Sequence, residues 1–154
     1  MPFVAEAFLS LDVPPEVAFD ALADHPSWRE WMPRSFTPMS KPDGPLRAGV
    51  RLKMKITGAP ATIEVTVVDR AREITWCGGV RGLLRAEHRF LFESDGKGGT
   101  KIHSHETWRG VLAPLLKPFV KPRAERIGGE QLAGLAKAVK RDRDGAARSS
   151  ESQA

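Results

Sequence analysis

The stretch LRAEHRFLFESDGKGGTKIHSHETWRG, Leu84–Gly110, alternates apolar and polar residues on both sides of a glycine-rich segment. Alternation with a period of two is typical of a β-strand that has one buried and one solvent-facing side. The central DGKGG favours a tight turn between neighbouring strands. The stretch therefore predicts two long antiparallel strands, residues 84–94 and 99–110, that pair side by side.

The alternation also predicts which side chains of these two strands face the interior. In the first strand the apolar set includes one polar member and comprises Ala86, His88, Phe90 and Phe92. In the second strand Lys101 and Arg109 mark the wet side, so His103 and His105 are expected to point to solvent. The inward set of the second strand then comprises Ile102, Ser104, Glu106 and Trp108.

The rest of the chain predicts the elements around this pair of strands. An alternating segment at residues 3–11 favours an opening strand, and two short helices are expected between Pro14-Pro15 and Pro33. Further strands are expected at 50–56, 61–69 and 72–79. After Gly110 the apolar residues recur at helical spacing, which predicts a long helix to about Arg141 with a hesitant start at Pro118 and Pro122 and a weak point at Gly128-Gly129.

Length and composition suit one globular domain, which we place at residues 1–142. The chain has 154 residues, 41% hydrophobic and 28% charged, enough to bury a core. Residues 143–154 are small and polar and are expected to be disordered. No apolar run is long enough to span a bilayer, and the first residues do not resemble a signal peptide, so a cytoplasmic location is expected. The single cysteine, Cys77, excludes an internal disulfide and is interpreted as a small strand residue.

The net charge of +5 is concentrated near the C-terminus. From Val111 onward nine Lys or Arg stand against five acids, a balance of +4, so the rest of the chain is nearly neutral. A broad basic surface that follows a nucleic-acid backbone is therefore not expected.

Three segments together resemble a known superfamily. They are LSLDVPPEVAFDALADHPSWREWMP (9–33), EHRFLF (87–92) and GGTKIHSHETWRGVLAPLL (98–116). They are similar to the helix-grip superfamily of START lipid-transfer domains, the birch-pollen allergen family and bacterial polyketide cyclase/dehydrase-like proteins. The resemblance implies an α+β fold in which a curved antiparallel sheet grips a long C-terminal helix, with two short helices after the first strand. It does not specify an activity, because such scaffolds host carriers, receptors and enzymes.

The resemblance also implies a cavity between the sheet and the long helix that holds a small hydrophobic molecule, such as a lipid or polyketide. Strand parity and helix position select the candidate ligand-binding residues, which are Trp76, His88, Phe90, Glu106, Trp108, Leu116, Val120 and Ile127. For the leucine, valine and isoleucine of the helix, and for Trp28 and Trp31 of the second short helix, plain core packing is the favoured interpretation. No cofactor is expected, and the protein is expected to be a monomer or weak dimer.

His88 and Glu106 are the candidate catalytic residues, because pairing of the two strands brings them into lateral contact on the inward face. Three roles remain open: a satisfied structural pair, a pair that orients a ligand oxygen, and an acid/base pair. A metal site at His103 and His105 is disfavoured, because the nearest third ligands lie on the opposite face.

Three functions therefore remain open. The first is binding of a small hydrophobic molecule, and the second is a cyclase or dehydratase that uses the His/Glu pair. The third is attachment of the basic C-terminal helix to an acidic partner.

Overall fold

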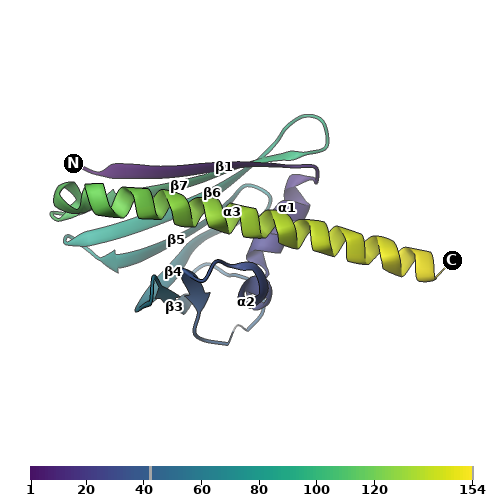
Figure 1. Cartoon of the computed structure of the whole chain (residues 1–154), viewed down its shortest axis with the longest axis horizontal. Helices are drawn as coiled ribbons and strands as arrows, with labels where there is room; N and C mark the ends of the chain where they lie inside the picture. The colour runs from purple at the N-terminus through teal and green to yellow at the C-terminus, as the bar shows by residue number, and fades with distance from the viewer. Residues whose placement is uncertain (42, 154) are drawn as a thin grey trace.

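Seven antiparallel strands form one sheet across residues 1–41 and 43–153, the part of the chain described by the computed structural model (Figure 1). The strand order is β1-β7-β6-β5-β4-β3-β2, so β1 closes back onto the last strand. The strands are β1 (Phe3–Leu11), β2 (Phe36–Pro38), β3 (Arg51–Ile56), β4 (Ala59–Asp69), β5 (Glu73–Val80), β6 (Leu84–Ser94) and β7 (Thr100–Arg109).

The helices lie on one side of this curved sheet. Between β1 and β2 come α1 (Pro15–Ala23), a 3-10 turn (His25–Ser27) and α2 (Trp28–Trp31), and the chain ends in α3 (Ala113–Ser152). Figure 1 shows α3 running lengthwise across the sheet, past α1, with its last turns beyond the strands. This arrangement confirms the predicted helix-grip fold. No helix in the described residues is both long and apolar enough to cross a membrane.

Register confirms the predicted faces of β6 and β7. His88 is directly opposite Glu106, and Ala86 is opposite Trp108. Directly opposed residues of antiparallel strands share a face, so these side chains point together toward α3. Ile102 and Ser104 of the same face are fully buried.

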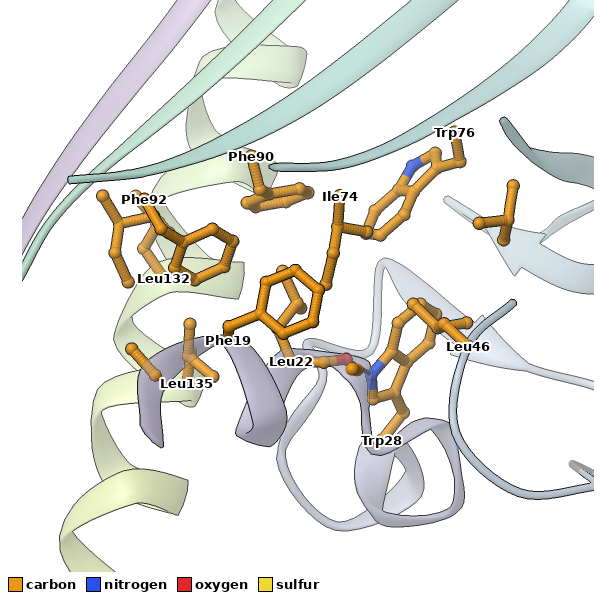
Figure 2. Packing of buried hydrophobic residues seen from close by; sticks show 14 of the residues in the cluster. Phe19, Leu22, Trp28, Leu46, Ile74, Trp76, Phe90, Phe92, Leu132 and Leu135 are labelled. Atoms are coloured by element: carbon orange, nitrogen blue, oxygen red, sulfur yellow. Dashed lines mark hydrogen bonds between the residues drawn. The ribbon is translucent and has the colours of Figure 1, made fainter. Parts of the chain in front are cut away.

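The core fills the end of the sheet that α1 and α2 cover (Figure 2). Trp28 is completely buried and its indole Nε1 donates to the carbonyl of Leu22 at 2.8 Å. Phe19 meets Phe92 edge-on at 5.4 Å between ring centroids. The middle of α3 supplies the other wall through Leu132 and Leu135. Trp28 therefore belongs to the core, as packing of the second short helix predicted.

Three features of the fold differ from the prediction, and the first two concern β2 and the end of the chain. Strand β2 was not predicted, because three residues ending in proline are too short a segment to establish an alternation. The long helix continues to Ser152 instead of ending near Arg141 before a disordered tail; Ala154 of that expected tail lies outside the described residues. Alanine, arginine and glutamate favour a helix, and no proline interrupts this stretch. Every residue from 140 to 153 is exposed, so these turns bury nothing.

Helix α3 is continuous through Pro118 and Pro122, where a hesitant start was expected. Both prolines are exposed, so the carbonyl groups that lose an N–H partner lie where water reaches them. Gly128 faces inward, and a Cβ there would lie 3.2 Å from Ser104 Oγ. This glycine allows the helix to approach the sheet closely.

Candidate functional site

A pocket of about 340 Å³ lies between α3 and the sheet. It occupies the end of the sheet away from α1, under the first half of α3. Its apolar walls come from strands and helix alike, with Phe36, Ile56, Ile63, Trp76, Ala86, Trp108, Val120, Ala124 and Ile127 among them. The walls suit an apolar guest, and the few polar groups among them determine what such a guest must carry.

His88 is held on both sides by neighbours from β7. Its Nε2 lies 2.7 Å from Ser104 Oγ, and its Nδ1 lies 3.4 Å from Glu106 Oε2. A serine hydroxyl both donates and accepts, so His88 can adopt the tautomer that suits either protonation state of Glu106. The ring also stacks on Phe90, with 4.2 Å between centroids. The imidazole is thus fixed in place while its proton remains free to switch nitrogens.

Burial pushes the pKa values of this pair in opposite directions. Loss of solvation lowers the pKa of His88 to about 3, and the nearby His105 adds to the effect. Loss of solvation raises the pKa of Glu106 to about 7, partly opposed by the neighbouring Trp108 indole. Both shifts favour the uncharged form, as expected of ionisable groups in an apolar wall. At neutral pH, His88 is therefore neutral and Glu106 is close to half protonated.

Two further polar side chains face the pocket without partners. Gln131 is 1% exposed, and neither its amide nitrogen nor its amide oxygen makes a hydrogen bond with any described residue. The Trp108 Nε1 is likewise buried and completes no hydrogen bond of good geometry with a described residue, although it lies close enough to the Glu106 carboxyl to lower the pKa of that group. Buried polar groups are almost always satisfied, so two unpaired groups on one pocket are unusual. They offer one donor from the indole and, from the amide, two N–H donors and one acceptor oxygen.

One positive charge lies on the pocket wall. Arg123 of α3 lines the pocket yet is exposed, and it forms no ion pair with another described residue. Because its side chain is exposed and also lines the pocket, it lies where the pocket wall meets solvent. It is the one charged lining residue besides Glu106 and, when protonated, His88 among the described residues.

The structure gathers six of the eight predicted ligand-binding residues around the pocket: Trp76, His88, Glu106, Trp108, Val120 and Ile127. Phe90 is fully buried outside the lining set, and its ring packs against those of Trp76 and His88. Leu116 is half-buried near the start of α3, outside the lining set. The prediction missed Gln131 and Arg123. Gln131 carried a signal, since it lies four residues after Ile127 and four before Leu135 in an otherwise apolar stripe.

His103 and His105 lie on the outer face of the sheet, but they are less exposed than predicted. Their side chains are 30% and 27% exposed, because β1 covers them. The Phe8 ring stacks on His103 at 4.5 Å, and Glu6 Oε1 lies 3.0 Å from His103 Nε2. In residues 1–41 and 43–153, no group of three or more His, Cys, Asp or Glu side chains is arranged to hold a metal ion.

Several solved structures share this fold. A hypothetical protein from Helicobacter pylori aligns with a TM-score of 0.71 at 17% identity, over 88% of this chain and 86% of that one. The ZhuI aromatase/cyclase from Streptomyces sp. R1128 aligns with a TM-score of 0.67 at 13% identity, over 92% and 95%. Ara h 8.0201 aligns with a TM-score of 0.58 at 18% identity, over 90% and 98%. At these identities the likeness shows the fold alone.

The sequence was also compared with curated proteins and with protein-family models. The curated proteins gave no match, whereas one family model matches. The model described as polyketide cyclase/dehydrase and lipid transport matches residues 3–140, which include all seven described strands and most of α3. The chain therefore belongs to the polyketide cyclase/dehydrase and lipid transport family.

Proposed function

We propose that this protein binds a small apolar molecule that carries at least one hydroxyl or carbonyl oxygen, in the pocket between α3 and the sheet. The pocket volume of about 340 Å³ is at the lower end of the range of about 300–1,000 Å³ that is usual for ligand sites. This size suits two or three fused rings or a medium-length acyl chain. The family description and the name of the Streptomyces aromatase/cyclase support the same class of guest.

The observation that carries this proposal is the buried Gln131 amide, which has no hydrogen-bond partner among the described residues and lines the same pocket as the Trp108 indole N–H. Leaving one buried polar group without a partner costs about 1–3 kcal/mol. A ligand oxygen that accepts from the Trp108 N–H or from the Gln131 amide removes that cost, whereas a pure hydrocarbon does not. Glu106, when protonated, adds a third donor to the same wall. The wall therefore selects oxygenated guests over hydrocarbons of the same shape.

A thermal-shift screen of fatty acids, aromatic ketones and phenols tests this proposal, together with mass spectrometry of protein purified from its native host. We expect oxygenated hits that raise the melting temperature of the natural protein. Val120→Trp narrows the pocket and should abolish these shifts, and Val17→Trp, an exposed position on α1, should not. No hits at all, or shifts that survive Val120→Trp, would contradict binding in this pocket.

A second function, a dehydratase or cyclase, is favoured by the pKa of Glu106. A group with a pKa of about 7 both accepts and donates protons at neutral pH. As a carboxylate, Glu106 would remove a proton from the carbon between a carbonyl and a hydroxyl-bearing carbon. It would then return that proton to the departing hydroxyl, so that a β-hydroxyketone becomes an enone and water. His88 would hold the carboxyl in place.

The two functions are separated by turnover of a bound aromatic β-hydroxyketone, followed through the absorbance of the enone. Catalysis predicts that Glu106→Gln lowers the rate about 100-fold or more while ligand binding persists. Binding without conversion in the natural protein would leave the carrier function and exclude this dehydration.

A further inference from the structure

We propose that the start of α3 and the adjoining β5–β6 turn form a surface that docks on anionic phospholipid bilayers beside the pocket. The surface, called here the docking face, consists of five exposed apolar side chains. They are Val80, Leu83, Val111, Leu115 and Phe119, with exposed fractions of 61%, 45%, 76%, 70% and 66%. Exposed apolar residues that gather in one place mark interaction sites.

The backbone holds the two parts of the docking face together. The Val111 N–H donates to the Gly82 carbonyl at 3.0 Å, and the Leu112 N–H donates to the Leu83 carbonyl at 3.0 Å. Leu115 and Phe119 are four residues apart on α3 and so lie on one side of its first turns, and Val111 lies in the turn just before the helix begins at Ala113. The exposed Pro114, Pro118 and Pro122 continue an adjacent stripe that is also apolar.

The charges around the docking face favour an anionic partner. The docking face and its rim lie within residues 80–86 and 107–124, leaving aside the strand residues that face inward. They contain six basic residues, Arg81, Arg85, Arg109, Lys117, Lys121 and Arg123, and no acidic residue. Lys121 is paired with Glu125, the next acid along α3, so five of these charges form no ion pair with another described residue. Apolar side chains that insert between lipids and basic side chains that meet anionic headgroups are the two signals that together give stable attachment to a bilayer.

The docking face borders the pocket. Val120, Arg123 and Ala124 of the same helical segment line the pocket, as do Gly78, Gly79 and Ala86 beside the β5–β6 turn. A docked molecule therefore places the pocket next to the lipid surface, where an apolar guest passes between bilayer and protein with little exposure to water. This consequence rests on the proposed binding function, whereas docking itself does not.

Vesicle co-sedimentation of the full chain tests the docking face. The natural protein should sediment with vesicles of equal phosphatidylcholine and phosphatidylglycerol at least tenfold more than with phosphatidylcholine alone, and less at high salt. Leu115→Ser with Phe119→Ser should lower binding at least tenfold, and so should Arg81→Glu with Lys117→Glu.

Matched controls use similar residues elsewhere. Val17→Ser with Met39→Ser removes exposed apolar residues outside the docking face, and Lys140→Glu with Arg143→Glu removes charges at the far end of α3. Neither control should reduce binding. The proposal is overturned if the natural protein ignores anionic vesicles, or if the Lys140/Arg143 pair is the one that matters. It is also overturned if the natural protein self-associates in sedimentation without lipid and the Leu115/Phe119 variant does not. The docking face would then be a dimer interface.

Binding of an apolar fluorescent probe in lipid-free solution separates this proposal from the pocket function. The docking-face variants should retain probe binding. A protein that sediments with vesicles as predicted but binds no probe would support docking and contradict the pocket function.

Discussion

Glu106 shows most clearly how burial sets the chemistry of a single residue. Its carboxyl lies in the pocket wall 3.4 Å from a neutral imidazole, with no basic group paired to it among the described residues. Burial raises its pKa from 4.5 to about 7. The folded state thus favours the protonated form, whereas the unfolded chain ionises near pH 4.5.

This shift makes the effect of Glu106→Gln dependent on pH. Because the folded pKa lies above the unfolded value, the contribution of protonated Glu106 is fully present below about pH 4.5 and is lost as the pH rises through 7. Across this window of about 2.5 pH units, the free energy of unfolding of the natural protein should fall by about 3 kcal/mol relative to that of the glutamine variant. Urea unfolding at pH 5 and pH 8 measures the difference.

Comparing the natural protein with Glu106→Gln removes the contribution of His88 titration, because His88 is present in both proteins. Its folded pKa of about 3 keeps it neutral throughout this range, and its unfolded-state titration is common to both chains. An unfolding free-energy difference that is the same at pH 5 and pH 8 would show that Glu106 is not desolvated as the structure indicates.

At the scale of elements, the packing of α3 depends on which face of the helix each of its glycines occupies. A Cβ at Gly134 would collide with the carbonyl oxygen of Trp31, whereas a Cβ at Gly129 would meet nothing within 4 Å. Gly134→Ala should therefore destabilise the protein by about 1–3 kcal/mol, since α2 must move away from α3.

Gly129→Ala is the matched control for Gly134→Ala. It should stabilise the protein by about 0.5–1 kcal/mol, because alanine favours the helix and the position is open. Chemical denaturation of the two variants gives both numbers. Equal effects of the same sign would mean that α3 does not pack on α2 at this distance.

The sequence predicts the elements that have a regular pattern of their own and misses one that depends on tertiary contact. The long strands follow from alternation, as in β6, where one parity is apolar apart from His88 and the final serine and the other is charged apart from Leu91. Strand β2 does not, because its three residues pair with β3 through tertiary contact rather than through any pattern of their own. The prolines and glycines of α3 lower its helical propensity, yet packing against β1 and β7 decides the outcome.

At the scale of the whole molecule, the packing divides the concave side of the sheet into two parts. One end is filled by α1, α2 and the middle of α3, around Trp28 (Figure 2). The other end, under the first half of α3, keeps the pocket. Parity and register place Trp76, His88, Glu106 and Trp108 on this side, which is why the sequence predicts them together. Gln131 could have been placed from its position in the apolar stripe between Ile127 and Leu135. The position of Arg123 depends on how α3 is rotated over the sheet at the edge of that stripe, which the charge of the residue does not indicate.

The central claim is that the unpaired groups of the pocket select an oxygenated guest. Calorimetric titration of 2-naphthol and naphthalene into the natural protein and into Gln131→Leu tests it, with Gln153→Leu, an exposed glutamine, as the control. The natural protein and the control should bind 2-naphthol about tenfold more tightly than naphthalene, which is the effect of one satisfied hydrogen bond of about 1.4 kcal/mol. Gln131→Leu should lose most of this preference, with the Trp108 N–H as the remaining indole donor. Equal affinity for the two compounds in the natural protein, or an unchanged preference in Gln131→Leu, would contradict the claim.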